Sequence, residues 1–167
     1  MNKIFLQFLI ILLIFNLTSC GIYSFTGASY GTAKTVTIDY FENKAALVNP
    51  TLSQTFTEKL KDKFISQTPL KLVDKKGDLQ FEGNITGYST APMGIQAGEV
   101  AATNRLTITI KVKFTNNTDS EQDFEKSYSD YEDYDSSQNL SEVQDALNDA
   151  IIEKIIDKIF NDSVVNW

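Results

Sequence analysis

The single cysteine of the chain, Cys20, has the surroundings that most clearly indicate a chemical reaction. It ends a Leu-Thr-Ser-Cys stretch that follows one basic residue, Lys3, and an apolar run over residues 4–17. A charged start, an apolar stretch too short to span a bilayer comfortably and small residues before the cut are typical of a secretory signal peptide. The cysteine at this point predicts bacterial lipoprotein processing, in which the thiol receives diacylglycerol, residues 1–19 are removed and the new amine is acylated.

The alternative is an ordinary signal peptide that happens to contain a cysteine, but a lone thiol in an oxidising compartment would have no disulfide partner. The covalent diacylglycerol and N-acyl lipid on Cys20 are the only non-protein groups that we expect, and no cofactor is predicted. Residues 20–32 then form a lipid-anchored segment, and residues 33–167 form a single domain. Residues 21–29 hold no acid, so neither inner-membrane retention nor surface export is indicated. We expect the protein to lie on the periplasmic side of the outer membrane.

Acidic and tyrosine side chains crowd residues 128–135, which read Tyr-Ser-Asp-Tyr-Glu-Asp-Tyr-Asp. Paired carboxylates could bind calcium or act as a glycosidase acid and base, but the calcium loop's glycine and spaced glutamate are missing. A run of charges is ordinarily a solvated surface. We therefore interpret this segment as a strand end that contacts a partner through Tyr128, Tyr131 and Tyr134, because a tyrosine ring can bury area while its hydroxyl stays hydrogen-bonded.

Three cationic residues are further candidates. Arg105 is the only arginine, and its planar guanidinium suits a phosphate or carboxylate of a partner, although a strand-end residue that pairs with a local acid is the simpler interpretation. Lys111 and Lys113 could meet anionic lipid or simply keep the sheet soluble, and the sequence does not separate these two roles. The chain has no histidine, which excludes imidazole catalysis and most zinc sites. We predict no catalytic residue and no metal.

The net charge of the whole chain is −7, and removal of residues 1–19, which contain Lys3 and no acid, makes it −8. Nucleic-acid binding needs a basic surface, so no nucleic acid is expected as a partner. An acidic chain also argues against peripheral docking on anionic lipid headgroups. Attachment to the membrane is therefore expected through the acyl chains alone.

Hydrophobic periodicity predicts the elements that position these residues. Apolar and polar residues alternate in the strands that we expect over residues 33–41, 70–73, 78–88, 104–115 and 123–131. Residues 89–103 are expected to form a long hairpin connection or a flap. A four-residue spacing predicts a helix that opens at Asn49-Pro50 and ends at Pro69, and a second helix with a capping box at Ser141 and Gln144. That helix is expected to end near Asn161.

The order is thus strand, helix, three or four strands, helix, and two helices can cover only one face of a four-stranded sheet. We therefore predict an α+β two-layer sandwich with two helices packed on one face of a four-stranded mixed sheet, in the order β-α-β-β-β-α. The other face, which bears threonines and lysines, is expected to stay open and polar.

Five segments carry a resemblance to a known family. They are CGIYSFTG at residues 20–27, NPTLSQTFTEKL at 49–60, GYSTAP at 87–92, NRLTITI at 104–110 and YEDYDSSQ at 131–138. Their order and spacing resemble LptE, the LPS-assembly lipoprotein family, over essentially the whole chain after the signal peptide. The resemblance implies two helices on one side of a four-stranded sheet. It also implies a non-enzymatic outer-membrane lipoprotein that plugs the large β-barrel LptD, helps it to fold and supports delivery of lipopolysaccharide to the outer leaflet.

The implied partner is thus a large LptD-like outer-membrane β-barrel. Direct contact with lipopolysaccharide stays open, because no basic cluster in the sequence matches the basic residues with which relatives are described to touch it. Two other classes also remain open. A free-standing periplasmic ligand-binding lipoprotein would need an apolar pocket between sheet and helices. An envelope enzyme would have to use the carboxylates Asp130, Glu132, Asp133 and Asp135.

Overall fold

The structure, a computed structural model, describes residues 31–47, 49–94 and 103–165. Cys20 and the signal peptide lie outside the described residues, as does the middle of the connection expected over residues 89–103. The strands are β1 (Thr35–Ile38), β2 (Glu42–Asn43), β3 (Lys71–Leu72), β4 (Leu79–Met93), β5 (Thr103–Asn116) and β6 (Phe124–Asp135). The helices are α2 (Leu52–Gln67), the short 3-10 helix η2 (Ser120–Gln122) and α3 (Leu140–Val164).

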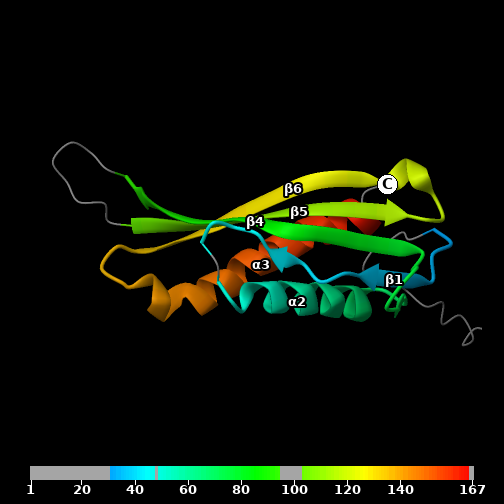
Figure 1. The fold of residues 1–167 in the computed structure, drawn as a ribbon, viewed down its shortest axis with the longest axis horizontal. Helices are drawn as coiled ribbons and strands as arrows, with labels where there is room; N and C mark the ends of the chain where they lie inside the picture. The colour runs from blue at the N-terminus through cyan, green and yellow to red at the C-terminus, as the bar shows by residue number, and fades with distance from the viewer. Residues whose placement is uncertain (1–30, 48, 95–102, 166–167) are drawn as a thin grey trace, which may run out of the picture.

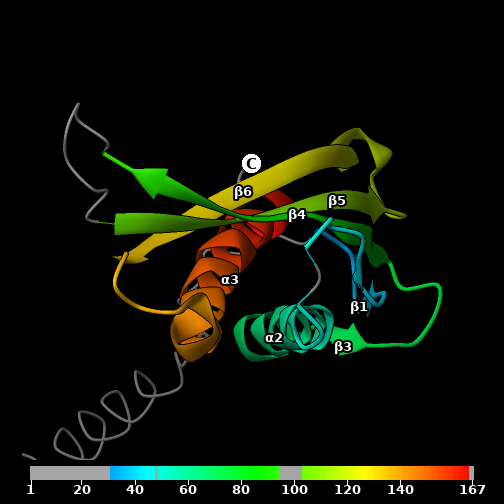
Figure 2. The ribbon, with the colours of Figure 1, turned by 60° about the vertical axis from the view of Figure 1, so that its left-hand side comes forward.

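These elements form two layers. Figures 1 and 2 show a twisted sheet with α2 and α3 lying on the same face of it. The strand order is β3-β1-β4-β5-β6, and β2 also pairs with β4. β1 runs parallel to β3 and β4, whereas β4, β5 and β6 are antiparallel. The predicted α+β sandwich, with a mixed sheet and two helices on one face, is confirmed.

The sheet has six strands rather than the predicted four. The strand expected over residues 33–41 is shorter and forms β1, and β2 follows just beyond its predicted end; both run parallel to β4. Between them, the backbone N–H of Phe41 donates a hydrogen bond to the hydroxyl of Thr57 in α2, at 3.1 Å, which interrupts the strand ladder. β2 contains only two residues, and a strand of that length shows no sequence period, whereas β3 lies within the strand predicted over residues 70–73.

The core lies between the sheet and the helices. The inward residues of β5 follow the predicted alternation and are at most 1 % exposed: Leu106, Ile108, Ile110, Val112 and Phe114. Aromatic rings join the layers, since the ring of Phe64 in α2 lies 4.8 Å from that of Phe81 in β4 and 5.2 Å from that of Phe160 in α3. Burial of these apolar side chains is the main force that holds the helices on the sheet.

A β-bulge adjusts which residues of β4 face the core. The register of β4 against β5 shifts between Ile85 and Gly87. Because one extra residue reverses the alternation of a strand, Ile85 and Tyr88 both point inward although they are three positions apart. Beyond the bulge, β4 continues to Met93, five residues past its predicted end.

The helix boundaries differ slightly from those predicted. α2 begins at Leu52, and the side chain of Asn49 accepts a hydrogen bond from the N–H of Thr51 at 3.1 Å. α3 begins at Leu140 with Asn139 as its N-cap, so the capping box predicted at Ser141 is wrong. Leu140 packs against the core and is drawn into the first turn.

Candidate interaction surface

The face of β4, β5 and β6 that points away from α2 and α3 is the first candidate surface, and we call it the open face. As predicted, Lys111 and Lys113 lie on it and are exposed. Each is ion-paired across the sheet: Lys111 with Glu125 of β6, and Lys113 with Glu82 of β4 at 3.2 Å. The hydrogen bond and charge of Lys111 hold the pKa of Glu125 below its ordinary value. Each of these lysines forms a pair with no net charge, so the two pairs attract an anionic lipid only weakly.

Arg105 also lies on the open face, where β5 pairs with β6. Its guanidinium donates two hydrogen bonds to the carboxylate of Asp133, at 2.7 and 2.9 Å. Its Cζ lies 3.5 Å from the centre of the Tyr131 ring. The hydrogen bonding between Arg105 and Asp133 raises the pKa of Arg105 and lowers that of Asp133. An acid on a neighbouring strand thus engages Arg105, which fixes the orientation of both Arg105 and the Tyr131 ring.

The three candidate tyrosines divide between the two faces of β6. Tyr131 is 45 % exposed, whereas Tyr128 and Tyr134 are buried in the core. The hydroxyl of Tyr128 donates to the carboxylate of Asp162 in α3, at 2.9 Å. Since the side chains of a strand alternate, residues 128 and 134 share one face and residue 131 takes the other. This burial argues against Tyr128 and Tyr134 as partner contacts, and contact through Tyr131 stays a prediction.

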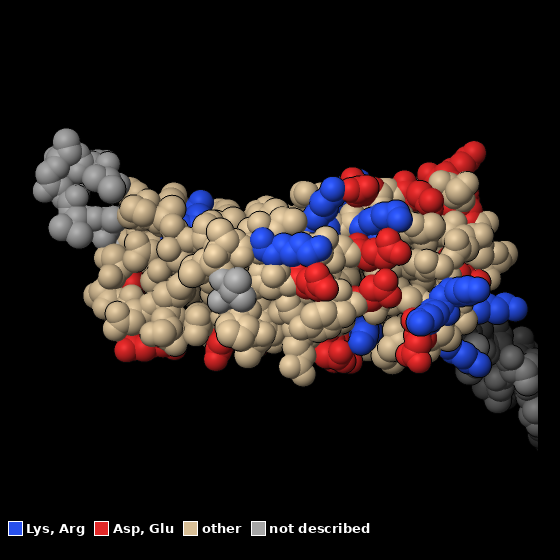
Figure 3. All heavy atoms as spheres, in the orientation of Figure 1, with Lys and Arg blue, Asp and Glu red and all other residues tan. Residues whose placement is uncertain are grey.

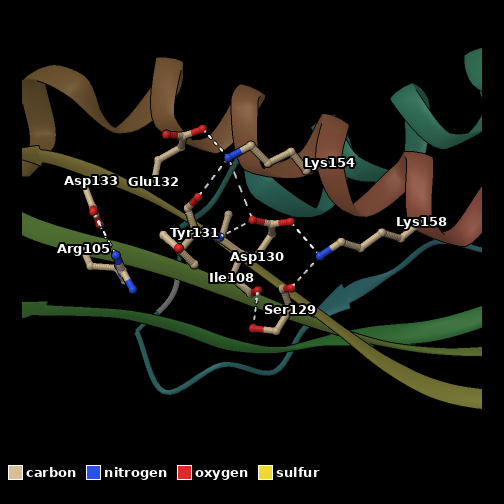
Figure 4. Close-up of polar contacts among 9 residues, drawn as sticks. All are labelled: Arg105, Ile108, Ser129, Asp130, Tyr131, Glu132, Asp133, Lys154 and Lys158. Atoms are coloured by element: carbon tan, nitrogen blue, oxygen red, sulfur yellow. Dashed lines mark hydrogen bonds and ion pairs between the residues drawn. The ribbon is translucent and has the colours of Figure 1, made fainter.

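Two carboxylates of the acidic segment face α3 rather than solvent. Asp130 is ion-paired with Lys158 at 2.7 Å, and Glu132 with Lys154 at 2.7 Å, as Figure 4 shows. Burial raises the pKa of Asp130, but the hydrogen bonds from Lys158 and from the Tyr131 N–H, together with the charges of Lys158 and Lys154, outweigh it. The pKa of Asp130 therefore lies below its ordinary value, and this carboxylate stays ionised.

The same lysines cover the outer edge of β6, which is the last strand of the sheet. The ammonium of Lys154 donates to the backbone oxygen of Tyr131, and that of Lys158 to the backbone oxygen of Ser129, both at 3.2 Å. The backbone N–H of Tyr131 donates to the carboxylate of Asp130 at 2.8 Å. Backbone groups at a free edge are the ones that pair with a foreign strand. At Ser129 and Tyr131 these groups already have partners (Figure 4).

The sequence analysis missed this arrangement. Lys154 and Lys158 are four positions apart, so they lie on one side of α3, while Asp130 and Glu132 are two apart and lie on one face of β6. These two spacings were readable in the sequence. That the two sides meet depends on the packing of α3 against β6.

The acidic segment has no free pair of carboxylates. Asp130 and Glu132 bind lysines, Asp133 binds Arg105, and Asp135 accepts a hydrogen bond from the Ser137 hydroxyl at 2.6 Å. Within the described ranges, no group of three or more His, Cys, Asp or Glu residues is placed to hold a metal ion. None of the described helices is long and apolar enough to cross a membrane. The surface is thus built from side chains that are fixed in place by their own contacts.

The fold and this surface define a class: a small α+β domain with two helices on one side of its sheet and a polar open face on the other. The sequence profile of LptE, described as Lipopolysaccharide-assembly, matches residues 33–163. The chain belongs to the lipopolysaccharide-assembly lipoprotein family LptE, as the resemblance predicted. No curated protein matches the chain.

Solved structures share the fold at low sequence identity. A minor lipoprotein from Acinetobacter baumannii is 10 % identical with a TM-score of 0.52, covering 77 % of this chain and 91 % of that one. Lipoprotein B from Nitrosomonas europaea is 14 % identical with a TM-score of 0.50, covering 77 % and 80 %. A Xanthomonas campestris protein is 9 % identical with a TM-score of 0.54, covering 77 % and 82 %. These likenesses concern the fold.

Proposed function

We propose that this chain is an outer-membrane lipoprotein, attached through lipid on Cys20, that occupies the lumen of an LptD-like β-barrel and assists its assembly. In this role it supports delivery of lipopolysaccharide to the outer leaflet and performs no catalysis itself. Membership of the LptE family is the observation that carries the proposal. It supports a part in lipopolysaccharide assembly, and the barrel is the partner that we infer from it.

The polar open face fits such a role. The interior of a large outer-membrane barrel is lined with polar side chains and water. A guest in that lumen needs a surface that is polar but not strongly charged, and the open face pairs its lysines and arginine with carboxylates of neighbouring strands. Tyr131 adds one exposed ring that Arg105 holds in place, and rigid aromatic anchors contribute strongly to protein interfaces.

The alternative hypothesis, a free-standing ligand-binding lipoprotein, requires an apolar pocket between the sheet and the helices. In the described residues, this space holds interlocked rings such as Phe64, Phe81 and Phe160. The packing therefore favours a protein that binds through its outer surface.

Co-purification tests the proposed function. The full chain is expressed with its signal peptide, outer membranes are extracted with detergent, and proteins held by the chain are identified. A barrel of several hundred residues in equal amount is the expected result. A Cys20→Ala variant serves as a control for the contribution of the anchor. Recovery of the chain as a lone monomer, together with unchanged surface lipopolysaccharide after its depletion, would overturn the proposal.

A further inference from the structure

The positive charges of this acidic protein are distributed unevenly. Ten of the fourteen Lys and Arg residues that the structure describes lie within 4.0 Å of a carboxylate oxygen. The other four have no ion pair with a described residue, and all four are exposed: Lys34, Lys71, Lys75 and Lys76. They are separated by up to 42 positions in the sequence.

The sheet brings these four lysines to one edge. Lys34 directly precedes β1, and the backbone N–H of Lys71 in β3 donates to the oxygen of Lys34 at 2.9 Å. Lys75 and Lys76 lie in the turn between β3 and β4. We call this set the lysine edge. Because β1 and β3 are neighbouring parallel strands, their lysines project from the same border of the molecule.

The turn that carries Lys75 and Lys76 is tied to β1. The hydroxyl of Thr37 donates to the oxygen of Val73 at 3.1 Å and accepts from the N–H of Gly77 at 2.9 Å. A Cβ at Gly77 would lie 2.7 Å from the backbone nitrogen of Thr37, so this close approach requires glycine. The lysines are therefore held near one another before any ligand binds.

A second group of hydrogen bonds connects the start of β1 to Asp78, at the end of the same turn. The carboxylate of Asp78 accepts from the backbone N–H groups of Lys34 at 2.8 Å and Thr35 at 3.0 Å. These hydrogen bonds keep the pKa of Asp78 below its ordinary value. The negative charge of Asp78 is thus occupied by backbone donors, while the ammonium groups nearby stay open to solvent.

Exposed apolar groups accompany the lysine edge. Leu72 of β3 is 39 % exposed, and Ile65, in the last turn of α2, is 51 % exposed. An apolar cavity of about 480 Å³ is lined by Ala33, Lys34, Thr35, Pro69 and Lys71. Cations beside apolar side chains are the combination by which proteins lie on an anionic membrane surface.

The lysine edge lies where the chain enters the domain. The described chain begins at Gly31, three positions before Lys34 and eleven after the lipid-modification site expected at Cys20. The border with unpaired cations is therefore the one nearest in the chain to the expected lipid. Because the lysine edge is so close in the chain to the expected lipid, the membrane surface in which that lipid is inserted is the partner that fits this edge.

Apart from Asp74, an exposed carboxylate in the turn that carries Lys75 and Lys76, charge of the opposite sign lies elsewhere at the same end. The turn between β5 and β6 carries Asp119, Glu121 and Asp123. In Figure 3, blue spheres at the lower right lie beside a few red ones, and red spheres project at the upper right of the molecule. An anionic surface attracts the first side and repels the second, so it would select one orientation of the domain.

We propose that the lysine edge, together with Leu72, is a membrane-docking surface that binds anionic phospholipid headgroups beside the lipid anchor. The ammonium groups of the four lysines contact lipid phosphates, and Leu72 enters the boundary between headgroups and acyl chains. The docking fixes how the domain stands on the membrane. It differs from the expectation drawn from net charge, because local charge rather than total charge acts within a Debye length of about 8 Å.

Vesicle flotation tests this proposal without the anchor. The chain from residue 20 to 167 with Cys20→Ser is mixed with phosphatidylcholine vesicles, with or without phosphatidylglycerol. We expect flotation only with phosphatidylglycerol, and a decrease as salt rises. The double variant Lys71→Gln/Lys75→Gln should lower the partition coefficient about 25-fold, since each lysine near an anionic surface contributes about fivefold. Both side chains are exposed, so the fold should be retained.

Lys111→Gln/Lys113→Gln is the matched control, because it changes the net charge equally on the open face and should leave flotation nearly unchanged. A second readout places an environment-sensitive dye on Leu72→Cys, with Ser127→Cys of the open face for comparison. Only the dye at position 72 should shift to the blue on phosphatidylglycerol vesicles. Equal loss in both double variants, no flotation with phosphatidylglycerol, or binding to lipopolysaccharide micelles alone would overturn the proposal. None of these results depends on a barrel partner, so the proposed function is tested separately.

Discussion

The guanidinium of Arg105 lies over the ring of Tyr131, with its Cζ 3.5 Å from the ring centre. Asp133, on the strand next to Arg105, holds the guanidinium through two hydrogen bonds. Stacking on the ring and two parallel hydrogen bonds together fix the planar guanidinium. A lysine ammonium is not planar and could not make both contacts in the same way. The result is a preorganised aromatic contact on an otherwise polar sheet face.

Arg105→Lys should therefore weaken binding of the barrel while it keeps the charge. Lysine lacks the planar fork and would leave the Tyr131 ring free to rotate. We expect the yield of barrel in co-purification to fall, with little change in the melting temperature of the isolated chain, because the site is exposed. Lys113→Arg, a cation on the same face that can keep its partner Glu82, is the control. An unchanged yield with Arg105→Lys would remove this contact from the interface.

Lys154→Ala/Lys158→Ala should increase self-association. The double variant uncovers the backbone oxygens of Ser129 and Tyr131 at the edge of β6, and free strand edges pair with one another. Sedimentation or light scattering should show larger particles than the parent chain at equal concentration. Lys59→Ala/Lys63→Ala removes two lysines that bridge α2 and α3 and is the control. Similar association of both variants would mean that lost charge, not the uncovered edge, is the cause.

Asp130 should make the stability of the fold depend on acid pH. Its pKa in the folded chain lies below the ordinary 3.8, so its contribution is present above that value and is lost as the pH falls through the folded pKa. Asp130→Asn should cost about 1 kcal/mol near neutral pH and should reduce the loss of stability on acidification. Urea unfolding as a function of pH measures both effects. Asp62→Asn, an exposed carboxylate of α2, should change neither.

Tyr128 should make the stability of the fold depend on pH in the alkaline range. Burial, the hydrogen bond to Asp162 and the charge of Asp162 raise its pKa above the ordinary 10.0. Its stabilisation is fully present below that value and is lost as the pH rises, because the unfolded chain ionises first. Tyr128→Phe should cost about 1 kcal/mol at neutral pH and reduce the alkaline loss of stability. Tyr131→Phe, on the exposed face, is the comparison, and an equal alkaline loss in all three proteins would contradict this role.

Gly83 should be irreplaceable in β4. A Cβ there would collide with the backbone oxygen of Lys111 and lie 2.5 Å from Cε1 of Phe41. Gly83→Ala should lower the free energy of unfolding by about 3 kcal/mol. Gly87→Ala is milder, because the nearest atom, Cβ of Thr109, lies 3.1 Å away and belongs to a side chain. Denaturant unfolding of both variants compares the two costs, and equal costs would mean that β5 moves aside easily.

Long periodic elements were predictable from the sequence. The alternation in β5 and the four-residue spacing of Leu52, Phe56, Leu60 and Phe64 identified which side chains are buried. These patterns arise because burial of apolar surface repeats with the period of the backbone. The same alternation separates Tyr131 from Tyr128 and Tyr134 once the inward face of β6 is known.

Short or interrupted elements needed the tertiary structure. β2 forms because β4 offers it backbone partners, and the β4 bulge arises in pairing with β5. The start of α3 at Leu140 follows from packing of that residue against the core. None of these is a local preference of the chain.

The sequence by itself determined the α+β class, the lone cysteine in its lipoprotein-like setting and the resemblance to LptE, because composition, periodicity and motif order are properties of the chain. Only the tertiary structure decided which charges are neutralised. It pairs Lys154 and Lys158 with a strand some twenty to thirty positions away, and it leaves four lysines together without ion partners in the described residues. Charge acts over a few ångströms in space rather than along the sequence, so folding determines which groups interact.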